Sequence, residues 1–584
     1  MNREKTLYAS VGALILLLII FASTYYVGLV AVLGVNAIVV IGLAFLMATG
    51  QISLGHAAFL GLGAYVSALL TMKIGMPVLL AIVCATLSCA VVGYVLAKLT
   101  LQLKGHYLPL ATLAYGIAIS VCFVGAMDLT GGASGLSGVQ PITVFGHRFD
   151  TRETALSIWL IIALLVMGYH RIYQGRIGRV ARAFKSNHIM ASAFGVNVSA
   201  TRTQIFVLSA ALGGISGALY GCYMQFLSPS AFSLEASINL LIMAVLGGAA
   251  GPLGAVLGCV IFTAIDLASQ YVIATLLHWP GQVETMVFGA GLIVILLKWP
   301  NGLLSWMGAS RPGPAKSNNF LNHDGKPVEA VRQPATLMVR NITMKFGGLT
   351  ALSDVNMSVP SRSIVGLIGP NGAGKSTLFN VLTQVFAASS GEVNFNGQPL
   401  PKNFPDVVRK GIARTFQHVQ LVQDMDVLQN VLIGGYINGR SGLFSSALGL
   451  DRTEEARLAS EARLALARVG LQDVASKKVS ELPLGSQRLV EVARALMARP
   501  SLLLLDEPAA GLRRSEKERL SSLLKSLRDE DGMTVLIVEH DMELVMGCAD
   551  HLFVLNFGNL LAQGNPAEVQ KNPDVINAYL GSEV

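Results

Sequence analysis

The sequence predicts two joined domains of different kinds, an α-helical polytopic membrane domain followed by a soluble α/β domain with a phosphate-binding loop. Two observations carry this prediction. Apolar runs without a charged residue recur through the first half of the chain, for example over residues 11–21 and 27–48. The segment Gly369-Pro-Asn-Gly-Ala-Gly-Lys-Ser-Thr377 then fits the pattern G-x-x-x-x-G-K-[ST]. One polypeptide therefore combines a membrane body with a nucleotide-binding domain.

Composition agrees with a membrane protein. Only 13% of the 584 residues are charged, which is low for a soluble chain. The net charge of +8 could indicate nucleic acid, but the basic residues cluster beside apolar runs, which favours a topology signal. We therefore expect no nucleic-acid partner. The six cysteines form no C-x-x-C pair, so neither a zinc site nor a disulfide framework is indicated.

Ten apolar segments are candidate membrane helices. A spanning helix needs about 20 apolar residues. Eight runs approach or exceed that length, namely 7–23, 26–47, 77–101, 108–127, 155–169, 203–226, 254–271 and 283–297. Two shorter stretches, 56–72 and 237–247, are candidates for short or re-entrant helices. We expect about eight to ten helices in all. The first run resembles a signal peptide, but no clear cleavage site follows it, so a retained helix is favoured.

Charged and small residues indicate how these helices are arranged. The basic loop 171–202 should be cytoplasmic, as should the N-terminus, whereas the polar loop 128–152 should lie outside. Gly213, Gly217 and Gly221 stand four residues apart, which predicts close helix packing in lipid. A stretch rich in Pro, Gly, Asn and Lys then separates the halves. The predicted domains are a permease-like membrane domain at 1–304, a linker at 305–335 and a nucleotide-binding domain at 336–584.

The nucleotide site is built on two apolar strands. The first, 363–368, enters the glycine loop, and a helix leaves it. Backbone amides of the loop should bind phosphate oxygens of ATP, Lys375 should lie near the β- and γ-phosphates, and Ser376 should ligate Mg²⁺. The loop residues of the predicted site are Gly369, Pro370, Asn371, Gly372, Ala373, Gly374, Lys375, Ser376 and Thr377. The second strand, 502–505, ends in Asp506 and Glu507, a magnesium ligand and a candidate general base.

At these residues the sequence resembles ATP-binding cassette (ABC) proteins. The resemblance implies that Gln417 senses the nucleotide and its metal, that His540 contacts the γ-phosphate, and that Phe346 stacks on adenine. It also implies that the loop 482–488 opens a helix facing a nucleotide on another subunit, through Gly485 and Ser486. The chain departs from the family pattern there, with Pro483 and Ser486 in the places of the usual serine and glutamine. Arg513 also replaces the usual Asp or Asn, which puts the activity of the shared site in doubt.

The apolar half has a resemblance of its own, to the permeases of branched-chain amino acid ABC importers. It is carried by segments 50–65, 104–107, 131–136, 175–179 and 193–197, and in the cassette by 346–351, 506–512 and 573–581. The implied fold is an α-helical polytopic membrane domain followed by an α/β P-loop ATP-binding cassette domain. The implied function is ATP-driven import of a branched-chain amino acid or a related small polar organic solute through the lipid bilayer of a bacterial-type cytoplasmic membrane. The implied partners are a second permease subunit, a second ATP-binding subunit and an extracytoplasmic solute-binding protein.

Three features of the sequence, the basic loop, His56 and Asp266, each have two interpretations. The basic loop is in part a topology signal, and its residues 183–198 are expected to form a coupling helix that docks near Gln417 of a cassette. His56 is either a substrate-site residue or a hydrogen-bonded core histidine, and Asp266 is either functional or solvated at a helix end. Two other functions remain open, an exporter half-transporter and a membrane-anchored regulatory ATPase that transports nothing.

Overall fold

The computed structural model describes residues 2–100, 107–248, 251–271, 289–291, 293–294, 297–298 and 334–580. The chain forms two compact units. The first comprises Met1–Gln174, Ser199–Lys316 and Ser446–Leu448, and the second comprises Gly175–Val198, Ser317–Ser445 and Gly449–Val584. The predicted linker lies almost entirely outside the described residues, so the boundaries 1–304, 305–335 and 336–584 stay predictions.

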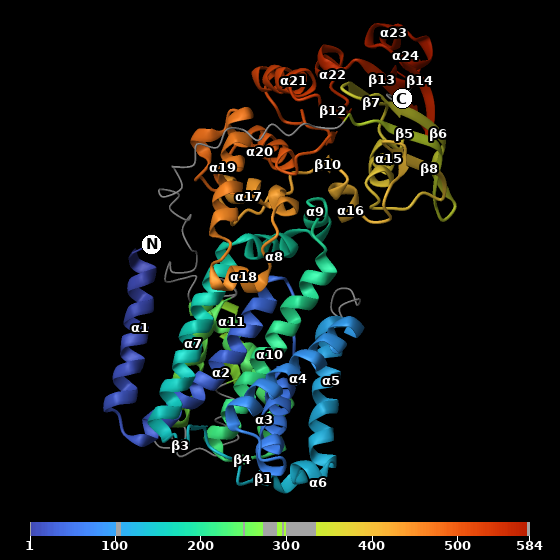
Figure 1. Ribbon diagram of the computed structural model, residues 1–584. Helices are drawn as coiled ribbons and strands as arrows, with labels where there is room; N and C mark the ends of the chain where they lie inside the picture. Colours follow the sequence, from blue (N-terminus) through green and yellow to red (C-terminus); the bar gives the residue numbers. More distant parts are fainter. Residues whose placement is uncertain are drawn as a thin grey trace. The chain divides into compact units, whose positions relative to one another are not determined.

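The first unit is helical (Figure 1). Its main helices are α1 (Asn2–Phe21), α2 (Thr24–Ala48), α3 (His56–Lys73), α4 (Val78–Thr100), α5 (Tyr107–Gly125), α7 (Thr151–Gln174), α10 (Val198–Met224), α11 (Leu234–Gly247) and α12 (Pro252–Gln270). Short elements join them: α6 (Met127–Thr130), β1 (Leu136–Ser137), β2 (Thr143–Val144), β3 (His147–Arg148) and β4 (Phe226–Leu227). β1 pairs with β4 and β2 pairs with β3, both antiparallel.

Within the described residues, six helices are long and apolar enough to cross a membrane, namely α2, α4, α5, α7, α10 and α12. They correspond to six of the eight predicted runs. The first run is α1, whose apolar part Ser10–Phe21 is shorter, and the run 283–297 lies mostly outside the described residues. The short segments form α3 and α11. The predicted helix type is confirmed, and the count of eight to ten stays a prediction.

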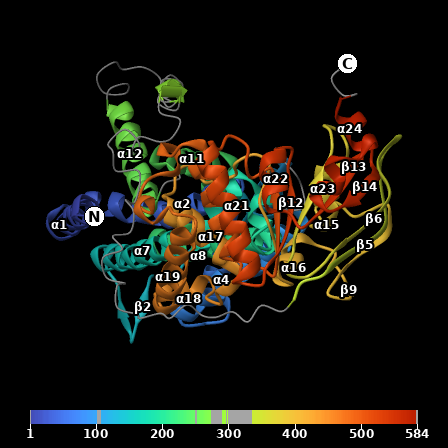
Figure 2. The ribbon, with the colours of Figure 1, turned by 90° about the horizontal axis from the view of Figure 1, so that it is seen from above.

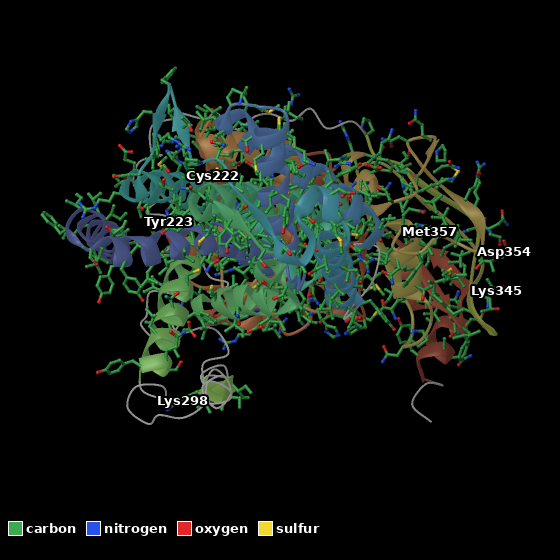
Figure 3. All side chains as sticks on the ribbon, turned by 90° about the horizontal axis from the view of Figure 1, so that it is seen from below. Cys222, Tyr223, Lys298, Lys345, Asp354 and Met357 are labelled. Atoms are coloured by element: carbon green, nitrogen blue, oxygen red, sulfur yellow. The ribbon has the colours of Figure 1, made fainter. Side chains whose placement is uncertain are left out.

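Helices α2 and α10 are the most buried of the six. They are joined directly, because the Ser216 hydroxyl donates to the Val35 carbonyl over 2.7 Å. Gly217 faces the Leu60 carbonyl of α3 so closely that a Cβ there would clash, and a Cβ on Gly28 would clash with the hydroxyl of Tyr223. Tyr223 and its neighbour Cys222 are labelled in Figure 3. The predicted use of small residues for close packing is therefore seen along α10.

The second unit contains two sheets. A six-stranded sheet has the order β10-β11-β12-β7-β13-β14, in which only β14 runs antiparallel to its neighbour. Its strands are β7 (Ile364–Ile368), β10 (Ile412–Arg414), β11 (Leu502–Asp506), β12 (Thr534–Val538), β13 (His551–Asn556) and β14 (Asn559–Gly564). An antiparallel sheet of order β6-β5-β8-β9 consists of β5 (Leu337–Phe346), β6 (Leu349–Val359), β8 (Ser390–Phe395) and β9 (Gln398–Pro399). Lys345, Asp354 and Met357 mark this sheet in Figure 3.

Helices cover both sheets. Their bounds are α8 (Arg176–Ser186), α9 (His188–Ser192), α15 (Lys375–Leu382), α16 (Phe404–Arg409), α17 (Val427–Gly434), α18 (Leu443–Leu448), α19 (Arg452–Arg468), α20 (Leu484–Leu496), α21 (Arg514–Asp529), α22 (Met542–Cys548), α23 (Pro566–Gln570) and α24 (Pro573–Leu580). Leu378 and Phe379 of α15 share one apolar core with β5, β7 and β8. Both ribbon views place α8 beside α17 and α19 (Figures 1 and 2). The fold class is confirmed.

The strand order explains where a ligand can bind. Strands β10, β11, β12 and β7 are parallel neighbours, so their carboxyl ends meet at one edge of the sheet. Four predicted functional segments follow these ends: 415–417 after β10, Asp506 and Glu507 at the end of β11, His540 after β12, and the glycine loop after β7. Open α/β sheets bind their ligands outside this edge.

Candidate functional site

The glycine loop binds the side chain of its own lysine, Lys375. β7 is wholly buried, and the chain then turns through Gly369, Gly372 and Gly374, whose φ angles of 150°, 81° and 100° favour glycine. The ammonium of Lys375, the first residue of α15, donates to the carbonyls of Gly369 and Pro370 over 2.7 and 2.9 Å. Burial lowers the pKa of Lys375, and the carboxylates of Glu507 and Asp506 oppose that shift. The loop thus holds a cation at a helix N-terminus, as a triphosphate requires.

Asp506 presents one carboxylate oxygen to the site and binds the protein with the other. Its Oδ2 accepts from Nη2 of Arg414 over 3.0 Å. Among the described residues, no group hydrogen-bonds to the buried Oδ1. Burial raises the pKa of Asp506, and the Arg414 guanidinium opposes the shift. A buried carboxylate oxygen without a donor is a suitable ligand for a hard divalent cation, as is the exposed Ser376 hydroxyl at the loop.

Arg414 joins this carboxylate to the helix that follows the glycine loop. Its Nη1 donates to Asn380 Oδ1 over 2.7 Å and to Thr383 Oγ1 over 3.1 Å. The guanidinium is buried between the rings of Phe379 and Phe416, at 5.5 Å from each centroid. The arrangement fixes the orientation of Asp506 relative to α15.

The side chains of Gln417 and His540 both approach the carboxylate of Glu507. The amide of Gln417 donates to Glu507 Oε1 over 3.2 Å, and His540 Nδ1 lies 3.6 Å from the same oxygen. Glu507 has a φ of 47°, in the region that L-residues rarely adopt, and its amide donates to the Val538 carbonyl of β12 over 2.9 Å. This strained backbone turns the carboxylate towards the ends of β10 and β12.

The remaining predicted site residues lie elsewhere in the unit. Phe346 is exposed at the end of β5 and meets the Phe386 ring edge-on, with 5.7 Å between centroids. Gly485 and Ser486 are in the first turn of α20, where Glu516 and Leu512 are the nearest neighbours of Gly485. The chain therefore brings Lys375, Asp506, Glu507, Gln417 and His540 to one edge, whereas Gly485 and Ser486 begin α20 beside Glu516 and Leu512.

Three charged residues of α20 hold the segment that follows β10. Arg488 donates to the carbonyls of Phe416 and Gln417. The Glu491 carboxylate accepts from the Gln420 amide over 2.9 Å, and Arg494 donates to the Gln420 carbonyl over 2.7 Å. The position of Gln417 is thus set by the helix that carries Gly485 and Ser486.

Arg494 also contacts the basic loop. It is fully buried, it pairs with Glu491 at 3.1 Å, and its guanidinium lies 4.7 Å from the Phe194 ring centroid. Its Nη1 is 3.6 Å from the Met190 sulfur. Burial lowers the pKa of Arg494 to about 10, so the side chain stays cationic at neutral pH. One buried cation therefore joins α20, the segment of Gln417 and the loop.

The basic loop has two helices where one was expected. Asn187 separates α8 from α9, because its side chain caps α9 by accepting from the amides of Ile189 and Met190. The same side chain donates to Gln420 Oε1 over 3.1 Å. Gly195, with a φ of 77°, turns the chain after α9, and its carbonyl accepts from Arg409. The loop 175–198 is accordingly part of the same compact unit as the cassette.

Helix α8 is held to α19 by ion pairs. Arg179 is buried and donates to both oxygens of Glu455 over 2.9 and 2.8 Å. The Arg176 amide donates to the same carboxylate over 2.8 Å, and its guanidinium lies 4.1 Å from the Tyr436 ring centroid. In the Arg179–Glu455 pair one guanidinium nitrogen, Nη2, contacts both carboxylate oxygens, and such charge-assisted hydrogen bonds are the strong ones.

Sequence reasoning assigned no role to Arg414, Arg488, Glu491 or Arg494. Charged side chains within otherwise apolar helix and strand patterns were the available signal, as in Val490-Glu-Val-Ala-Arg494. Their partners lie on other elements and could not be read from spacing.

In the membrane unit, His56 is a buried and hydrogen-bonded histidine. Its Nδ1 and Nε2 lie 2.8 and 2.7 Å from the hydroxyls of Ser53 and Ser209. Asp266 is partly buried in the last turns of α12, where it accepts from Gln270 over 3.3 Å. Both ring nitrogens of His56 are therefore used: Nδ1 contacts the turn that precedes α3, and Nε2 joins α3 to α10.

Three protein-family models match the chain. Residues 25–296 match "Branched-chain amino acid transport system / permease component", residues 352–510 match "ABC transporter", and residues 559–584 match "Branched-chain amino acid ATP-binding cassette transporter".

Curated relatives match the second half. The chain is 43% identical over 249 residues to the high-affinity branched-chain amino acid transport ATP-binding protein LivG of Salmonella typhimurium, covering 42% of this chain and 97% of that protein. It is 42% identical over 251 residues to BraF of Pseudomonas aeruginosa, which has the same description, again over 42% and 97%. A crystal structure of a nucleotide-free ATP-binding cassette from an ABC transporter is 34% identical, covers 42% of this chain and 98% of its own, and has a TM-score of 0.38.

Proposed function

Because this chain belongs to the branched-chain amino acid ABC transporter family and carries a permease and a cassette, we propose that it imports its solute with its own docked cassette as motor. The cassette binds ATP and hydrolyses it in a reaction coupled to transport. The chain is a multi-pass membrane protein with its ATPase in the cytoplasm. The proposed solute is a branched-chain amino acid or a related small polar organic compound, and the proposed site is a bacterial-type cytoplasmic membrane.

One observation supports the proposal most strongly. The loop 175–198 leaves α7 and returns to α10, and it packs on the cassette through Arg494. Arg494 also binds the backbone of the segment that carries Gln417, whose amide contacts Glu507. A few direct contacts therefore connect the nucleotide site to the permease loop. Such a connection is expected of an ATPase that drives alternating access.

The roles of the site residues follow from their positions. Glu507 is the general base that orients and deprotonates the attacking water, and His540 and Gln417 hold its carboxylate. Lys375 and the amides of Gly369–Thr377 bind the phosphates, with Lys375 neutralising charge that develops at the γ-phosphate. Phe346 stacks on adenine. Gly485 and Ser486 serve the nucleotide of a partner cassette.

Mg²⁺ fits the residues present. Asp506 Oδ1, which has no donor among the described residues, and the exposed Ser376 hydroxyl would hold it, with Gln417 nearby. When bound, the ion would neutralise charge on the phosphate oxygens. Arg414 keeps Asp506 aimed at that position.

The proposed partners follow from the role assigned to Gly485 and Ser486. If these residues serve the nucleotide of another cassette, a complete ATP site needs a second ATP-binding subunit. A second permease subunit and an extracytoplasmic solute-binding protein complete the proposed importer. A heteromeric complex is preferred to a homodimer, because a homodimer would carry Pro483 and Arg513 at both sites.

Transport direction tests this proposal against its alternatives. The complex, reconstituted in proteoliposomes with the solute-binding protein outside and ATP inside, should accumulate labelled leucine or a related solute in the lumen. Efflux from the ATP-loaded side would support an exporter. ATP hydrolysis that does not respond to the binding protein, without solute movement, would support a regulatory ATPase.

A further inference from the structure

Helix α18 and the residues after it expose large apolar side chains. Phe444 is 79% exposed, Leu448 67% and Leu450 72%. Phe444 and Leu448 are four residues apart, so they share one face of the helix. The opposite face includes the buried Ser446. Such a surface is costly in water and indicates that something covers it.

The position of α18 is given by its contact with α7. The guanidinium of Arg171 donates to the Ala447 carbonyl over 3.3 Å, and Ala447 lies beside Gly168. Residues Ser446–Leu448 belong to the compact unit of the membrane helices. The apolar face of α18 is therefore found at the end of α7 where basic residues begin.

The outer face of α7 is itself apolar up to this point. Leu160, Leu164 and Met167 are exposed, and with Arg171 they follow the spacing i, i+4, i+7, i+11 of one helix face. α7 is one of the helices long and apolar enough to span a membrane, so lipid can cover this stripe. The stripe ends at Arg171, whose guanidinium contacts the Ala447 carbonyl of α18.

Basic residues flank the exposed segment. Arg440 precedes it and Arg452 follows it, and both are exposed. Apolar side chains that are bordered by arginines suit the boundary between acyl chains and anionic headgroups. Lipid is therefore the occupant that this combination of apolar and basic side chains favours.

We propose that α18 and Leu450, named here the interfacial helix segment, insert into the headgroup region of the cytoplasmic leaflet, so that the cassette contacts lipid directly. Phe444, Leu448 and Leu450 reach the acyl boundary, and Arg440 and Arg452 bind lipid phosphates. The interaction tethers the interfacial helix segment to the leaflet. It requires that α7 spans the bilayer and is independent of the solute and of transport direction.

Lipid contact can be measured by fluorescence quenching. Phe444→Trp is compared in the full-length complex with Phe557→Trp, a position 84% exposed on the cassette after β13. Both are reconstituted in vesicles of phosphatidylcholine and phosphatidylglycerol with and without acyl-chain bromination, and the parental signal is subtracted. Leu448→Trp is the second reporter, so that one badly folded variant does not decide the result.

The tryptophans at 444 and 448 should lose several-fold more of their added emission in brominated vesicles than the tryptophan at 557. Equal weak quenching at all three positions would show that the segment faces water and would overturn the proposal. Blue-shifted emission without bromine quenching would show a protein subunit on this face and would overturn it as well.

Discussion

The guanidinium of Arg494 lies 4.7 Å from the ring centroid of Phe194. Arg494 belongs to the helix that begins with Gly485, and Phe194 belongs to the loop that joins two membrane helices. Through the Gln420 carbonyl the same arginine holds the segment of Gln417. The segment of Gln417, the helix that carries Gly485 and Ser486, and the loop between α7 and α10 thus share one buried cation.

Removing the charge of Arg494 should destabilise the cassette. Arg494→Met removes the nearer of the two arginines that pair with buried Glu491 and leaves Arg488 at 3.8 Å, and breaking a buried pair costs about 3–5 kcal/mol. Thermal unfolding of the purified full-length protein should show a marked fall in midpoint. Glu491→Gln combined with Arg494→Met should cost less than the sum of the two single changes. Strict additivity would mean that the two charges do not interact.

Glu507→Gln should separate binding from hydrolysis. The amide keeps the shape of the side chain but cannot accept a proton from water, so turnover should fall by about 10²–10⁴-fold while ATP still binds. Hydrolysis and equilibrium binding of labelled ATP by the complex are the two measurements. Glu518→Gln, an exposed position on α21, is the control. Near-normal turnover would remove Glu507 from its assigned role.

Arg414→Lys should raise the Mg²⁺ requirement. Lysine cannot span Asp506, Asn380 and Thr383 as the forked guanidinium does. Loss of such an orienting residue typically weakens metal binding about 10–100-fold. A titration of ATPase activity with Mg²⁺ checks this expectation. The exposed Arg340→Lys is the matched control. Superimposable Mg²⁺ curves for all three proteins would rule out the positioning role.

Arg488→Met should make the position of the Gln417 backbone less well defined. The substitution removes two hydrogen bonds from a guanidinium to the carbonyls of Phe416 and Gln417, each worth about 1.5–3 kcal/mol. Because Gln417 contacts Glu507, kcat should fall more than KM rises. Steady-state ATPase kinetics measure both parameters. A change confined to KM would place the effect on nucleotide binding instead.

The strands, the glycine loop and the acidic pair could be predicted because each is a local pattern with a fixed spacing. The break at Asn187 was also available locally, since Asn is a favoured helix cap. The network of Arg414, Arg488 and Arg494 could not be predicted, because its partners come from elements far apart along the chain. Burial of an arginine with its carboxylate is a property of packing, and no single segment encodes it.

The central claim is that the loop 175–198 couples this chain's cassette to its permease, and a charge exchange tests it most directly. Arg179→Glu, Glu455→Arg and the double variant are reconstituted with their partners, and the ratio of labelled solute imported to ATP hydrolysed is measured. Arg340→Glu, in an exposed pair of the same cassette, is the control.

Each single variant should lower that ratio, because like charges would face each other where buried Arg179 now pairs with Glu455. The double variant should recover a substantial part of it. An unchanged ratio in both single variants would contradict the claim.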